Sequence, residues 1–325
     1  DHAHGYCTDD NARALILTVL LEEQGGDTTD VNSLASCYAA FLNVAFNRDT
    51  ARFRNFMSFD RRWLEEDGSD DSQGRALWAL GTCIGRSRYT GLAAWARELF
   101  HRALPACEQT TSPRTWALAI MGIQEYLRHY SGDRAAATMA QQLADRLADL
   151  YVANATDEWP WFEDIKTYNN AKLSQALIAH GRWSDDQRAV EIGMKSLRWL
   201  CENQLSPQGR FRPIGSNGFS RKGGVAAVFD QQAIEAHATV SASIEAFAVS
   251  KDPFWNEQAH LAFDWFLGRN DLGQPIYDAS TGGCYDGLME NQVNENQGAE
   301  STLAFLLSLV EMRGHDASMR VLPTS

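Results

Sequence analysis

The sequence has no hydrophobic run long enough to cross a membrane, and it is poor in positive charge. No apolar stretch approaches the ~18–20 residues of a spanning helix, and no secretory signal peptide is recognisable. Lys and Arg number 29 against 42 Asp and Glu, which gives a formal net charge of −13. Nucleic acids and anionic membranes favour clustered basic residues, so neither is an expected partner, and a polyanionic substrate is disfavoured.

Paired cysteines and the short motifs of common nucleotide and serine enzymes are also missing. The six cysteines occur without CxxC spacing, and four lie inside predicted helices, which favours free thiols and a reducing, cytoplasmic location. The sequence shows no GxSxG, phosphate-binding loop or dinucleotide fingerprint. His2 and His4 form an HxH pair without a third ligand at suitable spacing. We therefore expect no metal and no cofactor.

Six polar clusters recur at intervals of roughly sixty residues, and each runs directly into an apolar segment rich in small residues. The clusters with their helices read TDDNARALILTVLL from Thr8, SDDSQGRALWALG from Ser69, TSPRTWALAIMGI from Thr111, YNNAKLSQALIAHG from Tyr168, FDQQAIEAHATVSASIEA from Phe229 and NENQGAESTLAFLLSL from Asn294. The first two share Arg-Ala-Leu, and the last two share Gln-x-x-Glu. A period of this size is typical of folds built from one recurring helical unit.

A second kind of helix, amphipathic and more charged, is predicted between the clusters, at about 31–47, 90–109, 134–155, 186–204 and 253–270. Helices that are apolar nearly all round belong inside a protein, whereas one-sided helices cover an outside. Six inner and five outer helices in alternation predict an all-α (α/α)6 toroid, as one domain over residues 1–325. One outer helix is missing from this count, and we expect it before Asp1. The N-termini of the inner helices are then expected to share one rim.

Paired acids open the first two of these inner helices, Asp9 with Asp10 and Asp70 with Asp71. One member of each pair is a candidate N-cap, a position that favours Asp, and the other is then able to face the axis. Hydrolysis of a glycosidic bond needs two carboxyl groups, one protonated and one ionised. The pairs therefore predict either helix caps or catalytic groups.

Aromatic and polar residues are mixed in the loops that lead into the inner helices. An aromatic ring suits the C–H face of a sugar, and neighbouring polar groups suit its hydroxyls. The alternative is that the rings only pack the loops down. Trp159 and Trp161 favour the sugar interpretation, because both lie within five residues of Glu163 and Asp164.

Two arginines, Arg13 and Arg75, fall near the starts of apolar helices, where an unpaired guanidinium is costly. We expect each to pair with a carboxylate of a neighbouring inner helix, such as Glu235 or Glu300. His180 and His237 are expected to be buried histidines with satisfied hydrogen bonds.

The repeat count, the helix alternation and the acidic residues at the starts of the inner helices together resemble the six-hairpin glycosidase superfamily of (α/α)6 toroids. HGYCTDDNARAL at His4–Leu15 and DSQGRALWALG at Asp71–Gly81 are also similar to a bacterial group often labelled glycosyltransferase or glycosidase-like. The resemblance covers essentially the whole chain. It implies that catalytic acids come from the N-terminal ends of inner helices or the loops joining them, and that inversion of configuration is favoured.

Carried over by position, the resemblance implies Asp10, Asp71 and Glu295 as the leading catalytic acids, with Glu163, Asp164 and Asp230 behind them. The preferred pair is Asp71 or Asp10 with Glu295, acting on a neutral oligosaccharide. Substrate binding is predicted for Asp9, Asn11, Asp70, Trp159, Trp161, Asp164, Asn170, Asp230, Tyr285, Glu290 and Asn294.

Two other functions remain open from the sequence. An N-acylglucosamine-epimerase-like sugar isomerase shares the toroid but transfers protons through histidines, for which His237 is the inner-helix candidate near an N-terminus. A non-catalytic carbohydrate-binding domain, fused to or associated with a glycosyltransferase, is the second alternative. Duplicated acid pairs favour catalysis over binding alone, because Asn and Gln hold neutral hydroxyls equally well.

Overall fold

The computed structural model of the protein describes residues 5–25 and 28–321, and most of these are helical. Contacts between Cα atoms divide the chain into two compact units, residues 1–147 and 148–325. The boundary falls inside the helix α6 (Arg134–Asn154). The prediction of a single domain therefore stays a prediction, and His2 and His4 lie outside the described residues.

The six polar clusters each open a helix, as the repeat predicts. These inner helices are α1 (Thr8–Glu23), α3 (Asp70–Arg86), α5 (Pro113–Leu127), α7 (Ala171–Ser184), α9 (Ala233–Ser250) and α11 (Ala299–Val321). In α3 every residue from Ser72 to Gly85 is buried, and in α7 every residue from Ala171 to Gly181. Burial on all sides is what their apolar, small-residue sequences predict.

The helices between them are the expected outer ones, α2 (Thr28–Ala45), α4 (Thr90–Ala103), α6, α8 (Gln187–Asn203) and α10 (Pro253–Phe266), with a 3-10 turn η1 (Leu104–Gln109) after α4. Their buried residues recur every three or four positions, as in the Ala189, Ile192, Gly193, Ser196 and Leu197 series of α8. This one-sided burial confirms the alternation of two helix types among the described residues.

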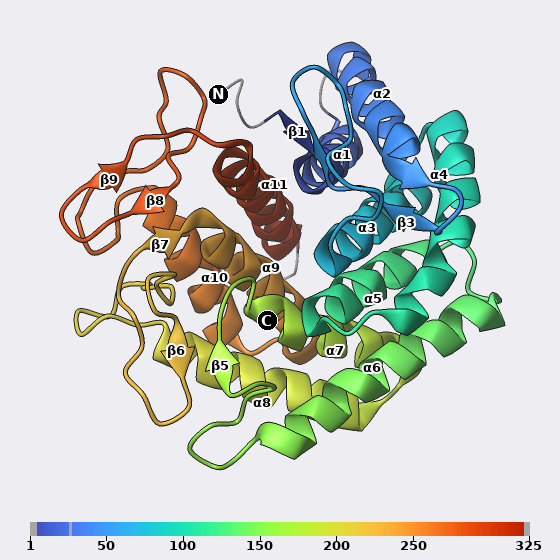
Figure 1. Ribbon diagram of the computed structural model, residues 1–325. Helices are drawn as coiled ribbons and strands as arrows, with labels where there is room; N and C mark the ends of the chain where they lie inside the picture. Colours follow the sequence, from blue (N-terminus) through green and yellow to red (C-terminus); the bar gives the residue numbers. More distant parts are fainter. Residues whose placement is uncertain (1–4, 26–27, 322–325) are drawn as a thin grey trace. The chain divides into compact units, whose positions relative to one another are not determined.

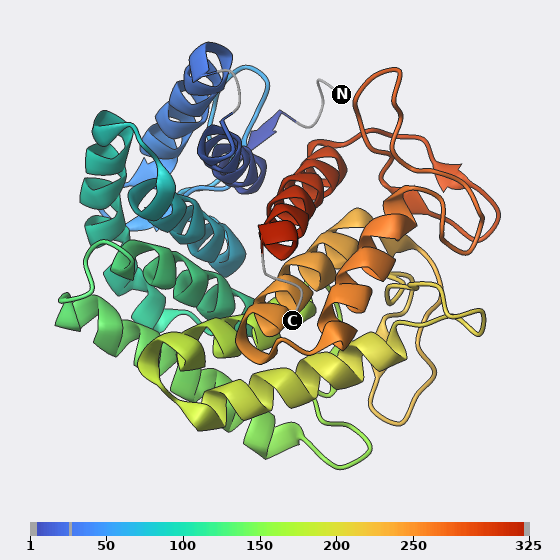
Figure 2. The ribbon, with the colours of Figure 1, turned by 180° about the vertical axis from the view of Figure 1, so that it is seen from behind.

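Each unit repeats the same packing scheme (Figures 1 and 2). In the first unit α1 packs on α2 and α3, and α3 packs on α4 and α5. In the second unit α7 packs on α8 and α9, and α9 packs on α10 and α11. In the second unit α11 packs on α9 and α10, and its buried residues, including Phe305 and Leu307, lie mainly on one side, unlike those of α3 and α7.

The contact between α3 and α5 is made by backbone against backbone. A Cβ atom added to Gly81 would lie 2.0 Å from the carbonyl oxygen of Gly122, and one added to Gly122 would lie 2.4 Å from that of Leu77. Real Cβ atoms do not approach so closely, so both positions require glycine. The two helices are therefore held at a separation that no larger side chain permits.

Short strands stiffen the loops that enter the inner helices. In the first unit β1 (Tyr6–Cys7) pairs with β4 (Phe56–Met57), and β2 (Phe46–Asn47) pairs with β3 (Arg52–Phe53). In the second unit β5 (Ile165–Lys166) pairs with β6 (Ser220–Arg221), and β8 (Gly287–Leu288) lies between β7 (Gln231–Gln232) and β9 (Val293–Asn294). All five of these strand pairs are antiparallel, and they position residues that precede the inner helices.

Candidate functional site

The first turn of α1 is capped by Cys7 rather than by an aspartate. The Cys7 sulfur accepts the backbone N–H of Asp10 at 3.4 Å, and its thiol donates to Asp10 Oδ2 at 3.1 Å. Asn11 adds a hydrogen bond from Nδ2 to the Cys7 carbonyl oxygen at 2.8 Å. The capping alternative for Asp9 and Asp10 is therefore wrong, because both residues lie inside the helix.

The second acidic pair has the same arrangement. Ser69 caps α3, with its hydroxyl accepting the N–H of Ser72 at 3.2 Å, so Asp70 and Asp71 occupy the first turn. All four aspartates consequently sit at the positive end of a helix dipole, where negative charge is stabilised. Their carboxylates are available for contacts other than capping.

Asp9 links the starts of α1 and α3 through two buried arginines. Its Oδ1 lies 3.1 Å from Arg75 Nε and its Oδ2 lies 3.3 Å from Arg13. Burial alone acts to raise the pKa of Asp9, but the charges of Arg75 and Arg13 outweigh it and hold that pKa below its usual value. The side chains of Arg13 and Arg75 are only 5% and 4% exposed, so this carboxylate neutralises charges that the core cannot solvate.

These contacts confirm that both arginines form ion pairs. The partner of Arg75 comes from a neighbouring inner helix, as predicted, although it is Asp9. Arg13 pairs within its own helix, with Asp9 and with Asp10 Oδ1 at 3.0 Å. Pairing with Glu235 or Glu300, which belong to the second unit, stays a prediction.

Asp70 joins the loop that precedes α3 to the residues that precede α5. One oxygen accepts from Arg52 at 2.7 Å, and the other accepts the backbone N–H groups of Thr111 and Ser112 at 3.0 and 3.4 Å. Burial opposes ionisation of Asp70, but these donors lower its pKa overall. The contacts give Asp70 a structural role, and its predicted substrate binding stays a prediction.

Asp71 faces the first turn of α5. Its Oδ1 accepts the hydroxyl of Ser112 at 2.9 Å and that of Thr115 at 3.3 Å, and the residue remains partly exposed. Each acidic pair therefore contains one aspartate that pairs with an arginine from another segment, Asp9 with Arg75 and Asp70 with Arg52. In contrast, Asp10 contacts Arg13 of its own helix, and Asp71 links α3 to α5 through hydroxyl groups. The Asp10 side chain is 31% exposed.

The segment 46–68 is fastened to the start of α1 by contacts that sequence reasoning missed. The N–H of Thr8 donates to the Asn55 carbonyl oxygen at 2.8 Å, and the N–H of Asp9 to Asn55 Oδ1 at 3.4 Å. Glu65 Oε1 accepts the N–H groups of Asn55 and Phe56 at 2.6 and 2.7 Å. Each of these contacts involves a backbone group, so no sequence motif indicates them.

In the second unit, a buried carboxylate joins the starts of α7 and α9. Glu235 is 2% exposed and accepts the backbone N–H groups of Asn169 and Asn170, together with Asn170 Nδ2 at 2.9 Å. Asn170 is fully buried, and its amide is also bonded to Thr167. Its predicted contact with substrate is corrected, because its side chain is buried and holds the start of α7.

Deeper in the same unit, α7, α9 and α11 share a polar cluster. Lys172 Nζ donates to Gln175 at 2.8 Å, and Gln175 donates to Ser241 at 3.0 Å. His237 Nε2 lies 3.5 Å from Glu311 Oε1. Burial acts to raise the pKa of Glu311, but His237, with the charge of Lys172 and a hydrogen bond from Ser241, brings it below the usual value.

The two tryptophans predicted to stack on sugar are buried. Trp159 is 7% exposed and donates from Nε1 to the Glu163 carbonyl oxygen, and Trp161 is 0% exposed. Both rings lie against Trp199. Lys166 places its ammonium 5.0 Å from the ring centroid of Trp159, and burial lowers the pKa of this lysine to about 8. The packing alternative therefore holds for both tryptophans, and the stacking prediction is corrected.

The other predicted residues of the second unit occupy its entry loops. Tyr285 packs on the core of the unit and is partly exposed, as are Glu163 and Asp230. Four more are exposed: Asp164, Glu290, Asn294 and Glu295.

The entry of α11 is organised by Asp286, which sequence reasoning missed. Its carboxylate accepts from Asn296, from the N–H of Gly298 and from the hydroxyl of Ser301. The backbone of Asn294 contributes as well, since its carbonyl oxygen accepts the Asp286 N–H at 3.2 Å. Asp286 lies thirteen residues before the start of α11, so no local sequence motif indicates its role there.

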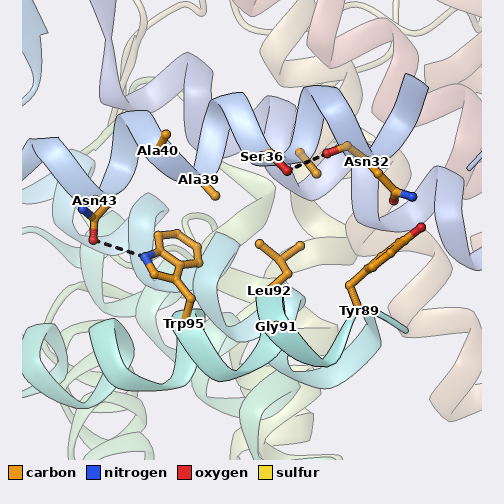
Figure 3. Close-up of a pocket in the computed structure, with 10 residues that line it drawn as sticks. Asn32, Ser36, Ala39, Ala40, Asn43, Tyr89, Gly91, Leu92 and Trp95 are labelled. Atoms are coloured by element: carbon orange, nitrogen blue, oxygen red, sulfur yellow. Dashed lines mark hydrogen bonds between the residues drawn. The ribbon is translucent and has the colours of Figure 1, made fainter. Parts of the chain in front are cut away.

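A groove of about 520 Å³ lies between the outer helices α2 and α4 (Figure 3). Alanines line its α2 wall, Tyr89 and Trp95 line the other, and Asn43 fixes Trp95 through a hydrogen bond of 3.2 Å. The lining residues include no Asp, Glu or His, so this groove offers none of these side chains as an acid or base for catalysis.

Within residues 5–25 and 28–321, no group of three potential ligands is placed to hold a metal ion. No helix in these ranges is long and apolar enough to span a membrane.

No family model matches the sequence, and no curated protein matches it either. Solved structures do. A sugar epimerase from a ruminal bacterium superposes with a TM-score of 0.72 at 14% identity, over 97% of this chain and 89% of that one. The chain has the fold of such enzymes. This fold is the predicted all-α (α/α)6 fold.

Glycoside hydrolases share this fold as well. The cellulase Cel9M of C. cellulolyticum, in complex with cellobiose, gives a TM-score of 0.64 at 11% identity over 97% of this chain and 86% of that one. The GH76 alpha-mannanase of Bacteroides thetaiotaomicron gives 0.65 at 9% identity over 97% and 88%. Similarity at this level of identity establishes the fold, and the reaction has to be argued from the residues.

Proposed function

We propose that the protein is a carbohydrate-active enzyme that hydrolyses a glycosidic bond in a neutral oligosaccharide. One observation carries the proposal: Asp10 and Asp71 occupy the first turns of neighbouring inner helices without capping them, and both remain partly exposed. Carboxylates placed at helix N-termini are stabilised in the ionised form, which is the form that activates water or attacks a sugar. Solved structures with the same fold include a cellulase and a mannanase, which supports the same reaction class.

The two aspartates keep their places as candidates for one carboxyl group of the catalytic pair. Asp71 accepts two hydroxyl hydrogen bonds, and Asp10 contacts the guanidinium of Arg13. Glu295 stays the proposed second carboxyl group, with Glu163 behind it. Among the predicted binding residues, Asn11, Asp164, Asp230, Tyr285, Glu290 and Asn294 are kept as contacts to sugar hydroxyls or rings.

The test uses the division within each acidic pair. The purified protein is incubated with α- and β-linked gluco-, manno- and galacto-oligosaccharides, and the release of reducing ends is followed. Asp71→Asn is expected to lower kcat by about 100-fold or more and to lower the unfolding midpoint only slightly, because an amide oxygen still accepts the hydroxyls of Ser112 and Thr115. Its neighbour Asp70→Asn is the matched control, and it is expected to lower the unfolding midpoint with a much smaller effect on kcat. Equal losses of activity in both variants would assign Asp71 a structural role.

A second function, sugar isomerisation, is supported by the pair of His237 and Glu311. A histidine beside a carboxylate is a competent proton carrier, and this one is held between α9 and α11 with Lys172 nearby. Incubation in D₂O separates the two reactions, because an isomerase that removes a proton from carbon introduces deuterium into the sugar, and a hydrolase does not. His237→Asn would abolish such exchange. Binding without cleavage or exchange supports the third possibility, a sugar-binding accessory of a glycosyltransferase.

A further inference from the structure

The exposed ring of Phe56 stands next to the start of α1 and has no role in the chemistry described above. We propose that Phe56 is a stacking platform for a pyranose ring bound beside Asp10, so that the ligand is a neutral oligosaccharide extending over this ring. The inference rests on the proposed function for its ligand class, but it concerns a different residue and a different property, affinity.

Phe56 lies on the same face of a ladder as the residue that caps α1. It is the direct cross-strand partner of Cys7 in the antiparallel pair β1–β4. Directly opposed residues project from the same face with Cβ atoms about 4.5–5.5 Å apart. Since the Cys7 thiol donates to Asp10 Oδ2 at 3.1 Å, the residue opposite Phe56 in the ladder directly contacts the Asp10 carboxylate.

The backbone of Phe56 is held from both sides while its ring is left in solvent. Its N–H donates to Glu65 Oε1 at 2.7 Å, its carbonyl oxygen accepts the N–H of Leu64 at 3.0 Å, and the ring is 47% exposed. A fixed backbone positions the ring without burying it. A ring that served only to pack the loop, as Trp161 does, would be covered.

Other aromatic residues of the segment do not have this position. Phe59 is 51% exposed but stacks on Tyr6, with ring centroids 6.2 Å apart and planes 11° apart. Tyr6 is opposite Met57 in the ladder, so it projects from the face away from Cys7 and Phe56. Phe59 is therefore a matched control for Phe56. It has the same side chain and a similar exposure and belongs to the same loop, but it stacks on Tyr6, which projects from the other face of the ladder.

The surroundings suit the hydroxyl groups of a sugar. Asp10 offers carboxylate oxygens that accept sugar hydroxyls, and a further carboxylate, Glu65, belongs to the same loop. The axial C–H face of a pyranose covers an aromatic ring through apolar contact, and covering about 50 Å² of ring accounts for roughly a tenfold gain in affinity.

The experiment measures binding directly and separately from turnover. Dissociation constants for tri- to hexasaccharides of the neutral panel are determined by calorimetry and by affinity electrophoresis for the wild type, Phe56→Ala, Phe56→Trp and Phe59→Ala. We expect Phe56→Ala to weaken binding of the best ligand by about tenfold. Phe56→Trp is expected to retain or improve binding, and Phe59→Ala to leave it within about twofold. Unfolding midpoints of the variants are recorded beside the binding data.

The outcomes separate this inference from the proposed function. Equal binding by the wild type and Phe56→Ala refutes the platform even if the protein cleaves oligosaccharides. Binding that depends on Phe56 supports the platform even if neither cleavage nor isotope exchange is found, which would refute the proposed hydrolysis alone. If Phe59→Ala weakens binding as much as Phe56→Ala does, the inference is refuted, because the effect would then belong to the loop as a whole. A wild-type protein that binds none of the sugars also refutes the inference.

Discussion

Replacing Asp9 by Asn removes the charge that neutralises two buried arginines. The amide keeps the shape of the side chain and retains some hydrogen bonding, but the guanidinium groups of Arg13 and Arg75 lose their shared anion. Breaking a buried pair by removing one partner costs ~3–5 kcal/mol. The Asp9 side chain is 22% exposed, which places the expected loss of unfolding free energy near the lower end, at about 3 kcal/mol.

Asp10→Asn is the control for this variant. Asp10 contacts Arg13 but not, among the described ion pairs, Arg75, and it is more exposed than Asp9. An ion pair of this kind contributes about 1 kcal/mol or less. Urea unfolding followed by tryptophan fluorescence at pH 7 measures both variants. Losses that agree within about 0.5 kcal/mol would refute the reasoning that Asp9 is the structural member of the pair.

The pH dependence gives an independent check with a defined sign. The pKa of Asp9 is lowered in the folded protein, so the stabilisation is fully present above the unfolded pKa of about 4. It is lost as the pH falls through the lower, folded value. The difference in stability between the wild type and Asp9→Asn should therefore be constant from pH 7 to about 5 and shrink below about pH 4. A difference that grows on acidification would contradict the assignment.

Three further predictions test the packing. Gly81→Ala should lower the unfolding free energy by about 3 kcal/mol, because the added Cβ would collide with backbone atoms. Gly91→Ala in α4 adds a Cβ that would lie in open space, and it should raise the unfolding free energy by up to about 1 kcal/mol. Urea titrations measure both variants. Trp159→Phe should cost about 1 kcal/mol more than Trp161→Phe, because Trp159 Nε1 donates a hydrogen bond and Trp161 Nε1 has no partner among the described atoms; a reversed order in thermal unfolding would contradict this. Lys166→Met should stabilise the protein by up to about 3 kcal/mol below pH 8, where the wild type buries a charged amine, and the gain should vanish as the pH rises to about 10.5, as followed by urea titrations across this range.

The helices were predictable from the sequence because their evidence is local and periodic. The polar entry followed by an all-round apolar helix is visible in every repeat, and the outer segments show the spacing of one-sided helices. For α10 the predicted start at residue 253 is the observed one, and for α6 the predicted 134–155 differs from the observed range by one residue.

The different roles of the two aspartates within each acidic pair could not be predicted in the same way. Asp is a common N-cap, so Asp9 and Asp70 were reasonable caps, but Cys7 and Ser69 precede them by one or two residues and take that position. Which aspartate of a pair is structural depends on Arg75 or Arg52, which come from other segments of the chain. Contacts of that kind have no signature in the local sequence.

Burial of the aromatic loop residues also escaped sequence reasoning. Trp159 and Trp161 pack against Trp199, which lies on α8 about forty residues away, whereas Phe56 is kept in solvent by a two-residue ladder. Sequence shows that a loop is rich in rings and acids. It does not show which rings the rest of the fold covers.

The glycine contact between α3 and α5 bears on how such a protein can change over evolutionary time. Because Gly81 and Gly122 bring two backbones together, the spacing of these helices does not depend on the identity of the side chains around them. Asp71 begins one of these helices, and its partners Ser112 and Thr115 stand at the start of the other. Mutations can therefore accumulate in the outer helices and entry loops, and new ligand preferences can arise there, while the catalytic candidate keeps its position.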